Sequence, residues 1–234
     1  MLKFIRKIIR TDLLIGAMKK FFATVIYCCV VSFPLMVSAQ EQKPNVIYIL
    51  ADDLGYGDVG YNGQELIETP ELDKLAHNGM RFTNHYCGNA VCAPSRASLL
   101  MGQHPGHAYI RSNSPGYPDG QTPIPADSET LGKLMQRAGY KTACIGKWGL
   151  GGFHDKGNPN KQGFDYFYGY TDQVLAHNYY PKYLWQNGKK QFLDNGNGKQ
   201  NDYSHDLFTD KAISFIKQNK NEPFFLYLAY TIPH

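Results

Sequence analysis

Two apolar runs constrain the fold of this chain more than any other feature. Residues 45–51 read Asn-Val-Ile-Tyr-Ile-Leu-Ala, and residues 224–230 read Phe-Phe-Leu-Tyr-Leu-Ala-Tyr. Runs of this kind, which lack the polar alternation of a half-exposed strand, are typical of parallel strands that are buried on both faces. They predict a sheet with helices on both sides.

The segments between the two runs carry helix signals. Residues 69–79 open with Thr-Pro-Glu and close with Gly, which predicts a helix with an N-cap, a proline at its first position and a glycine end. Further helices are predicted over residues 128–138 and 204–219, and a short strand over residues 142–146. The order of strand, helix, helix, strand, helix, strand predicts an α/β fold with a largely parallel sheet.

The first 39 residues are interpreted as a targeting segment. A charged start at residues 18–20 precedes 16 mostly apolar residues, and the small-residue sequence Val-Ser-Ala then ends at Ala39. This pattern indicates a signal peptide over residues 1–39 whose true start is Met18. Its apolar stretch is shorter than the about 20 residues of a membrane span, although an uncleaved anchor stays an alternative. We therefore expect export to the periplasm or outside the cell, without stable membrane insertion after cleavage.

Loss of this segment changes the charge balance. The chain has 24 Lys and Arg against 20 Asp and Glu, but six of the basic residues and one acidic residue lie in residues 1–39. The remaining residues 40–234 have a formal net charge of −1. A nucleic-acid partner therefore has no electrostatic support.

Export also leaves three cysteines in the mature chain, which are Cys87, Cys92 and Cys144. An odd number in an oxidising compartment leaves at least one of them outside any internal disulfide. A disulfide between Cys87 and Cys144 is possible, but only the number of cysteines supports it. An unpaired thiol in that compartment needs a chemical role.

Polar residues follow three of the predicted strands. Asp52 and Asp53 come after the first strand, Lys147 after the middle one and His234 after the last. Ligands of open α/β sheets bind at the carboxyl ends of strands. The sequence therefore predicts one site that is assembled from three separated segments.

The stretch that begins at Cys92 is the most informative one. It reads Cys-Ala-Pro-Ser-Arg-Ala-Ser-Leu-Leu-Met-Gly and ends at Gly102. Pro94 suits the first turn of a helix, so Cys92 is expected at a helix N-terminus, where backbone N–H groups and the helix dipole favour an anion. Arg96 lies one turn further on the same face, where its guanidinium can reach whatever Cys92 attacks.

This stretch resembles the signature of the sulfatase family, C-x-P-S-R-x-x-x-L-x-G. The resemblance covers essentially all of residues 43–234 and implies an alkaline-phosphatase-like fold. It also implies that a maturation enzyme converts Cys92 to formylglycine, whose hydrated aldehyde attacks sulfur. The expected activity is that of a sulfuric ester hydrolase, acting on a sulfated glycan or an aryl sulfate.

A second signature, G-Y-x-T-x-x-x-G-K-W-H, is similar to residues 139–149. The similarity implies that Lys147 contacts the sulfate or the formylglycine oxygens. The chain departs from it at Gly149, where the signature has His. Two other histidines are candidates to replace it, His154 and His177, and an ordinary surface role stays open for both. His177 is favoured, because the sequence Ala-His-Asn-Tyr-Tyr-Pro around it resembles a substrate-side loop of glycan sulfatases.

The resemblance also implies a metal site and a further active-site residue. Asp52 and Asp53 match the start of the family's metal site, and with Cys92 they imply a hard divalent cation, most simply Ca²⁺. That metal would polarise the sulfate ester. His234, in Ile-Pro-His, resembles an active-site histidine, so it is expected to join Lys147 in substrate contact and catalysis.

Members of the family are considerably longer than this chain. Residues 40–234 are therefore expected to be the N-terminal part of a catalytic domain, incomplete and with little activity alone. Two rival functions stay open. One is a formylglycine phosphodiesterase or phosphonate hydrolase, and the other is a non-catalytic protein that binds sulfated glycans.

Overall fold

The computed structural model describes residues 18–24, 43–116 and 120–234. Residues 1–43 and 44–234 form two separate compact units. In the first unit residues 18–24 are helical, and the other residues of the expected signal peptide lie outside the described part of the chain. None of the described helices is long and apolar enough to cross a membrane.

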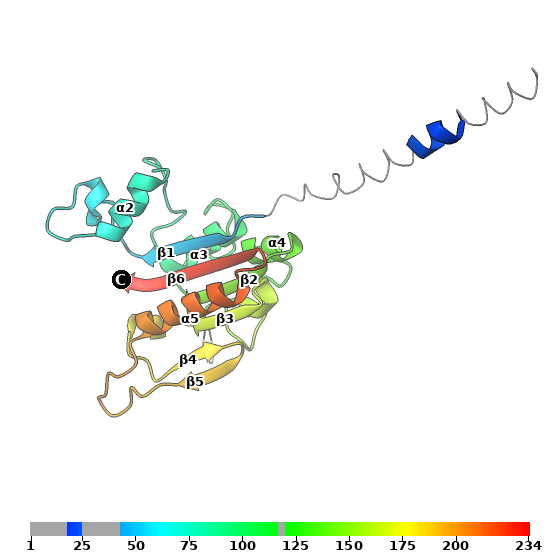
Figure 1. The fold of residues 1–234 in the computed structure, drawn as a ribbon. Helices are drawn as coiled ribbons and strands as arrows, with labels where there is room; N and C mark the ends of the chain where they lie inside the picture. Colours follow the sequence, from blue (N-terminus) through cyan, green and yellow to red (C-terminus); the bar gives the residue numbers. More distant parts are fainter. Residues whose placement is uncertain (1–17, 25–42, 117–119) are drawn as a thin grey trace, which may run out of the picture. The chain divides into compact units, whose positions relative to one another are not determined.

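The second unit is built on six strands: β1 (Val46–Asp52), β2 (Lys141–Lys147), β3 (Tyr166–Tyr170), β4 (Tyr183–Gln186), β5 (Lys189–Phe192) and β6 (Phe224–Pro233). They lie in the order β1-β6-β2-β3-β4-β5 across the sheet (Figure 1). The first four strands in this order pair parallel, and β4 and β5 add an antiparallel edge. The predicted α/β fold with a mostly parallel sheet is confirmed.

Three helices of the described residues pack on the sheet: α3 (Cys92–Met101), α4 (Leu131–Arg137) and α5 (Ser204–Asn219). A fourth, α2 (Pro70–Asn78), buries none of its residues and lies against the 3-10 turn η2 (Gly60–Asn62). The other short 3-10 turns are η1 (Tyr56–Asp58), η3 (Pro159–Gln162) and η4 (Leu175–His177). α2 and α5 agree with the sequence predictions. α4 begins three residues later than predicted, because the Thr130 side chain accepts a hydrogen bond from the Lys133 backbone N–H and so caps the helix.

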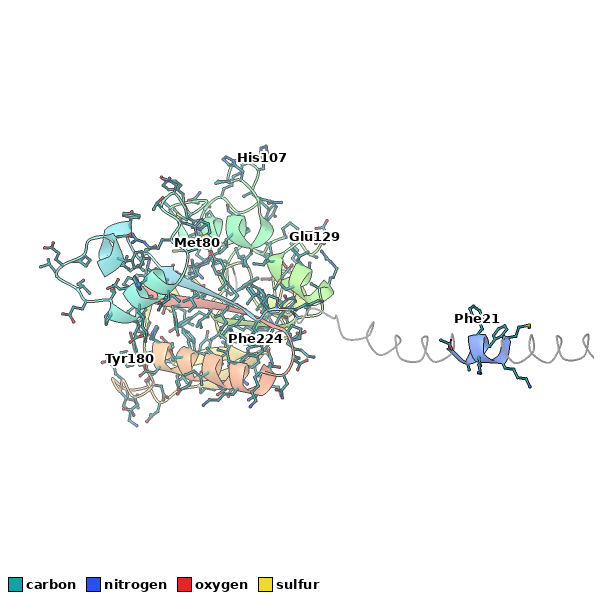
Figure 2. All side chains as sticks on the ribbon, turned by 45° about the horizontal axis from the view of Figure 1, so that its top comes forward. Phe21, Met80, His107, Glu129, Tyr180 and Phe224 are labelled. Atoms are coloured by element: carbon teal, nitrogen blue, oxygen red, sulfur yellow. The ribbon has the colours of Figure 1, made fainter. Side chains whose placement is uncertain are left out.

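The sheet buries a hydrophobic core on each face. Alternate residues of β6 serve the two cores, since Phe225 and Tyr227 pack with α3 and α4, whereas Phe224 and Leu226 pack with α5. Phe224, labelled in Figure 2, lies with its ring centroid 5.7 Å from that of Phe215 on α5. A strand with helices on both sides is apolar throughout, and this explains the second apolar run.

The first apolar run behaves differently, and the prediction of a strand buried on both faces is wrong for β1. Tyr48 packs into the core beside Tyr227. Ile47 and Ile49 on the other face are 45% and 59% exposed. β1 is the edge strand of the described sheet, and α5 packs over β6, β2 and β3 instead.

The antiparallel edge was not predicted. β4 and β5 are joined by Asn187 and Gly188, which both have positive φ, 45° and 83°. Positive φ at both central residues is typical of the tight turn of a two-residue hairpin. The hairpin widens the sheet on the side away from β1.

Candidate active site

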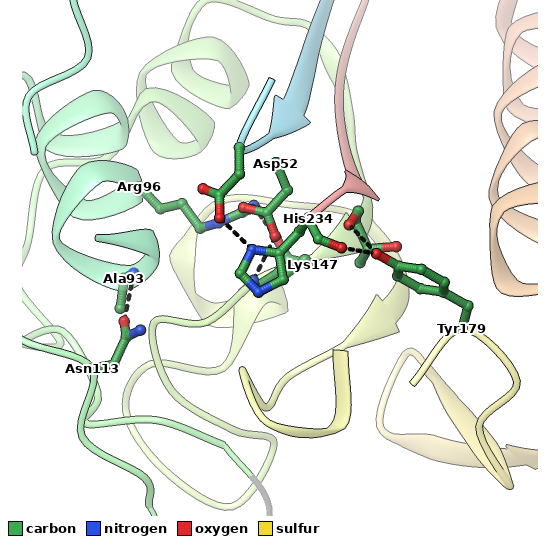
Figure 3. A network of polar contacts seen from close by, with 9 residues as sticks. Asp52, Ala93, Arg96, Asn113, Lys147, Tyr179 and His234 are labelled. Carbon is green, nitrogen blue, oxygen red and sulfur yellow. Dashed lines mark hydrogen bonds and ion pairs between the residues drawn. The ribbon is translucent and has the colours of Figure 1, made fainter. Parts of the chain in front are cut away.

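The carboxyl ends of three neighbouring strands meet at one place. Asp52 is the last residue of β1, Lys147 is the last residue of β2, and His234 directly follows β6. Figure 3 shows their side chains converging with that of Arg96 from α3. The structure thus brings together the three segments as predicted from the sequence.

Three of these groups form a buried network, here called the inner cluster, of Asp52, Arg96 and Lys147. Asp52 Oδ1 accepts a hydrogen bond of 2.9 Å from Arg96 Nη2, and Oδ2 accepts one of 2.5 Å from Lys147 Nζ. Arg96 Nη1 also donates to the Lys147 carbonyl oxygen at 2.5 Å. The three residues are 5%, 2% and 0% exposed, so Arg96 is not a surface arginine.

Asp52 and Arg96 keep their charges although they are buried. Burial raises the pKa of Asp52, but the charges and hydrogen bonds of Arg96 and Lys147 outweigh burial and hold that pKa below its usual value. Burial lowers the pKa of Arg96, and the nearby Tyr227 and Asp52 more than offset this, so the guanidinium stays protonated. A carboxylate between two cations fixes both of their positions.

Cys92 is the first residue of α3, as predicted, and is half-buried. The preceding residue, Val91, offers no side-chain cap, and the Ala93 backbone N–H instead donates to Asn113 Oδ1 at 2.9 Å. Cys92 lines a pocket of about 250 Å³ together with Asp52, Asp53 and Arg96. The helix N-terminus and the guanidinium both favour an anion in this pocket.

The other two described cysteines do not compete for this role. Cys144 is fully buried in β2, and burial raises the pKa of its thiol far above the usual range. Cys87 is exposed, and it forms no disulfide with Cys144. The pairing that the sequence left open is therefore absent.

Asp53, Cys92 and His234 form a second group, here called the outer cluster. Asp53 has a φ of 63° and an exposed side chain, and its Oδ2 bonds to His234 Nδ1. One ligand atom from each of these residues and from Asp52 lies within 4.8 Å of the others. Two carboxylates and an imidazole suit a divalent cation, whereas the thiol of Cys92 does not suit a hard one such as Ca²⁺.

A profile of the Sulfatase family matches residues 44–234. The chain belongs to the sulfatase family. It is 35% identical over 196 residues to the N-acetylglucosamine-6-O-sulfatase of Bacteroides thetaiotaomicron, a match that covers 83% of this chain and 31% of that protein. Among solved structures, Ps i-CgsB is similar with a TM-score of 0.71 and 35% identity, over 82% of this chain and 46% of that one.

A further similar structure was solved in complex with its substrate, D-glucosamine-2-N,6-O-disulfate. It has a TM-score of 0.67 and 33% identity, over 82% of this chain and 35% of that one. The phosphonate monoester hydrolase of Agrobacterium radiobacter, with a TM-score of 0.56 and 19% identity, shares the fold alone. This sulfatase chain spans about a third of the curated relative and under half of the similar structures.

The two histidines that were candidates to replace the missing signature residue lie in different places. His177, at the end of η4, stacks on His234 with ring centroids 4.4 Å apart. Burial, Lys147 and His234 together lower the pKa of His177. His154 is exposed and packs against Trp185. Of the two, the structure brings His177 to the site.

Three groups around the site were missed in the sequence. Tyr179 donates a hydrogen bond to the His234 carbonyl oxygen, and it belongs to the substrate-side loop that drew attention to His177. Asn113 approaches the start of α3 from a distant loop, and no local pattern marks it. Gln173 lies against Gly149, the position at which the chain departs from the sulfatase signature.

Proposed function

We propose that the complete protein is an exported sulfuric ester hydrolase that removes sulfate from a sulfated glycan or an aryl sulfate. The reaction would use a formylglycine made from Cys92 and a divalent cation, most simply Ca²⁺. A maturation enzyme in the producing cell would carry out the conversion of Cys92.

One observation carries this proposal. Cys92 opens α3 at the wall of a pocket that Arg96 and the two aspartates also line. A buried structural cysteine would instead resemble Cys144, which lies inside the sheet core. A nucleophile needs access, nearby positive charge and a firm backbone, and Cys92 has all three.

The reaction consumes one water molecule and yields an alcohol, a sulfate ion and a proton. Formylglycine supplies, as its hydrate, an oxygen nucleophile with a second hydroxyl that a plain serine or cysteine lacks. Arg96 and Lys147 would bind the sulfate oxygens, whose negative charge rises as the ester bond breaks. His234 would hand a proton to the departing alcohol oxygen.

The donors of the outer cluster fit a divalent cation once the Cys92 sulfur gives way to an oxygen. Asp52 and Asp53 would then supply carboxylate ligands, because each carboxylate can accept more than the hydrogen bonds it makes in this structure. A bound cation would polarise the sulfate ester and neutralise developing charge. The inner cluster would hold Asp52 in the orientation that this requires.

The substrate class rests on the relatives. The curated relative is named for a 6-O-sulfated amino sugar, and one similar structure holds a sulfated glucosamine. We therefore infer a sulfated sugar as the first substrate to test. The phosphonate-hydrolase alternative is not favoured, because the likeness to that enzyme extends to the fold alone.

Mass spectrometry of the protein exported by its native host tests the proposal. Trypsin cleavage after Arg81 and Arg96 releases a peptide that contains both Cys87 and Cys92. Conversion is expected to make this peptide about 18 Da lighter, with the loss assigned by fragmentation to Cys92. Cys87 serves as the internal control, since it should react fully with an alkylating reagent.

Unconverted thiol at Cys92 in every such peptide would contradict the formylglycine mechanism. Hydrolysis of phosphate or phosphonate esters in preference to sulfate esters by the complete protein would favour the phosphonate-hydrolase alternative. Binding of sulfated sugars by a converted protein without any turnover would favour the non-catalytic alternative.

A further inference from the structure

The side chain of Gln173 fills the space that a side chain at position 149 would need. Gly149 has a φ of 72°, and a Cβ built on it would lie 1.7 Å from Gln173 Nε2 and 2.8 Å from Gln173 Cδ. Such contacts are far shorter than van der Waals distance, so no residue with a side chain fits at position 149 while Gln173 keeps its place. The glycine is what admits the glutamine amide.

The amide of Gln173 has no partner of its own. The residue is 2% exposed, and both Nε2 and Oε1 lack a hydrogen bond within the described structure. Burial of an unpaired amide is costly, so such a group normally has a partner in the working molecule.

The other two buried glutamines of the described residues each bond through one end of the amide, although Gln121 Nε2 and Gln162 Oε1 have no partner. Gln162 Nε2 donates to the carbonyl oxygens of Pro125 and Lys156, and Gln121 Oε1 accepts from the Ser114 backbone N–H. These two glutamines tie loops together. Gln173 differs from them because neither atom of its amide has a partner in the described residues.

The location of Gln173 points to a ligand. It follows β3, at the same carboxyl edge as Lys147, and Gly149 lies only two residues after Lys147. The segment that carries it is held by the Asp172 side chain, which accepts from the Leu175 backbone N–H at 2.7 Å, and it leads into His177 beside His234. Gln173 therefore stands on a fixed turn between two groups of the site.

Other unpaired polar groups accompany it. The hydroxyls of Thr171, just after β3, and Thr231, near the end of β6, are also buried and without a partner in the described residues. β3 and β6 lie on either side of β2, the strand that ends at Lys147. These unpaired groups lie at the edge of the sheet where a polar ligand is expected, although other buried polar atoms without a partner lie elsewhere in the described residues.

We propose that Gln173 is a substrate-contacting residue of this site, whose Nε2 donates a hydrogen bond to an oxygen of the bound sulfate group. Gly149 is its necessary counterpart, since the two residues together take the place of the histidine in the related signature. This inference deepens the proposed function and rests on it. A neutral amide gives this contact without titrating, so its contribution should not vary with pH between about 5 and 9.

The test is Gln173→Met in the complete, formylglycine-bearing protein. Methionine keeps nearly the same volume but removes the amide. We expect kcat on a sulfate ester to fall about 10- to 100-fold, and inhibition by inorganic sulfate to weaken about 10-fold, with the melting temperature unchanged or raised. Gln162→Met is the matched control, and it should lower the melting temperature while inhibition by sulfate stays as in the wild type.

A reciprocal exchange sharpens the test. Gly149→His alone should clash with Gln173 and lose activity, whereas Gly149→His combined with Gln173→Gly should recover part of it, because histidine tolerates positive φ better than most residues. The pH profile of the recovered turnover should also differ from that of the wild type, because an imidazole at position 149 titrates near neutral pH and the Gln173 amide does not.

Wild-type kcat and sulfate inhibition in Gln173→Met would show that the glutamine only fills space, and the inference would fall while the proposed function stands. If the wild type hydrolyses no sulfate ester, the proposed function falls, and thermal stabilisation by inorganic sulfate decides the role of Gln173. Stabilisation of the wild type but not of Gln173→Met would uphold the contact, and equal stabilisation of both, or of neither, would refute it.

Discussion

The inner and outer clusters lie side by side but differ in how their charges are satisfied. Asp52 and Asp53 are adjacent in sequence, yet Asp52 is buried between two cations whereas Asp53 is exposed and bonds to His234. Removal of one charge from the inner cluster leaves an opposite charge buried without its partner. Removal of the exposed Asp53 charge from the outer cluster leaves no buried charge unpaired. We therefore expect the inner cluster to govern stability and orientation, and the outer cluster to govern chemistry.

The largest effect is expected in the outer cluster, from Cys92→Ala in the complete protein. Turnover should fall about 10⁴-fold or more, because the nucleophile is lost. The melting temperature should change by no more than about 2–4 °C, since Cys92 belongs to no buried network. Cys87→Ala is the matched control, because Cys87 lines the same pocket without opening a helix. Retained turnover in Cys92→Ala would place the nucleophile elsewhere.

The two adjacent aspartates give the most direct test of the contrast. Asp52→Asn should lower the free energy of unfolding by about 3–5 kcal/mol, because it leaves Arg96 and Lys147 buried without a counter-charge. Asp53→Asn should change it by no more than about 0.5 kcal/mol in metal-free protein. Urea unfolding of the two variants and the wild type measures both changes in the free energy of unfolding. Equal losses would break the distinction between the clusters.

Arg96→Lys tests whether the inner cluster also orients the reacting groups. The Arg96 guanidinium reaches Asp52 and the Lys147 carbonyl oxygen at once, and a lysine cannot reproduce this planar fork. We expect kcat to fall about 10²–10³-fold, even in the fraction that stays folded. Full activity of Arg96→Lys would reduce its role to a general positive field.

The outer cluster should respond to metal, with a smaller effect. Ca²⁺ at about 100 times its dissociation constant should stabilise the complete, matured protein by about 2.7 kcal/mol, and a chelator should reverse this. Most of that gain should be lost in Asp53→Asn, because one carboxylate ligand is gone. Calcium-dependent melting temperatures measure the difference. An undiminished gain in Asp53→Asn would exclude Asp53 as a ligand.

Much of the site was accessible from the sequence, because it depends on local signals. Polar residues after apolar strands mark the carboxyl edge of a parallel sheet, and this placed Asp52, Lys147 and His234 together correctly. The proline two residues after Cys92 placed that residue at a helix start. Each of these inferences needs only the strand or helix in which the residue lies.

What was missed depends on packing between distant segments. Gln173 fills the space above Gly149 only because β2 and β3 are neighbours, and no pattern around position 173 shows this. The exposure of Ile49 on β1 depends on which strands α5 covers. The hairpin was a different kind of omission, since Asn187-Gly188 is a strong turn signal that the sequence already contained.

The smallest effect is expected from acid, and it tests whether Asp52 is ionised in the folded protein. Its pKa is raised by burial but lowered further by Arg96 and Lys147, so it lies below the unfolded value of about 3.9. Between the two pKa values the unfolded chain binds more protons than the folded one, so stability falls with falling pH there. The stabilisation by Asp52 is thus complete above about pH 3.9 and is lost as pH falls through the folded pKa.

The difference in the free energy of unfolding between metal-free wild type and Asp52→Asn should therefore stay constant from pH 7 to about pH 5 and shrink below about pH 4. Asp53→Asn is the control for loss of a neighbouring carboxylate outside the buried network. A difference that stays constant down to acid unfolding would mean that folding does not lower the pKa of Asp52, and one that grows as pH falls from 7 to about 4 would mean that Asp52 is protonated in the folded state. Arg96 and Lys147 would then share no buried counter-ion, and the inner cluster could not hold their charges in place.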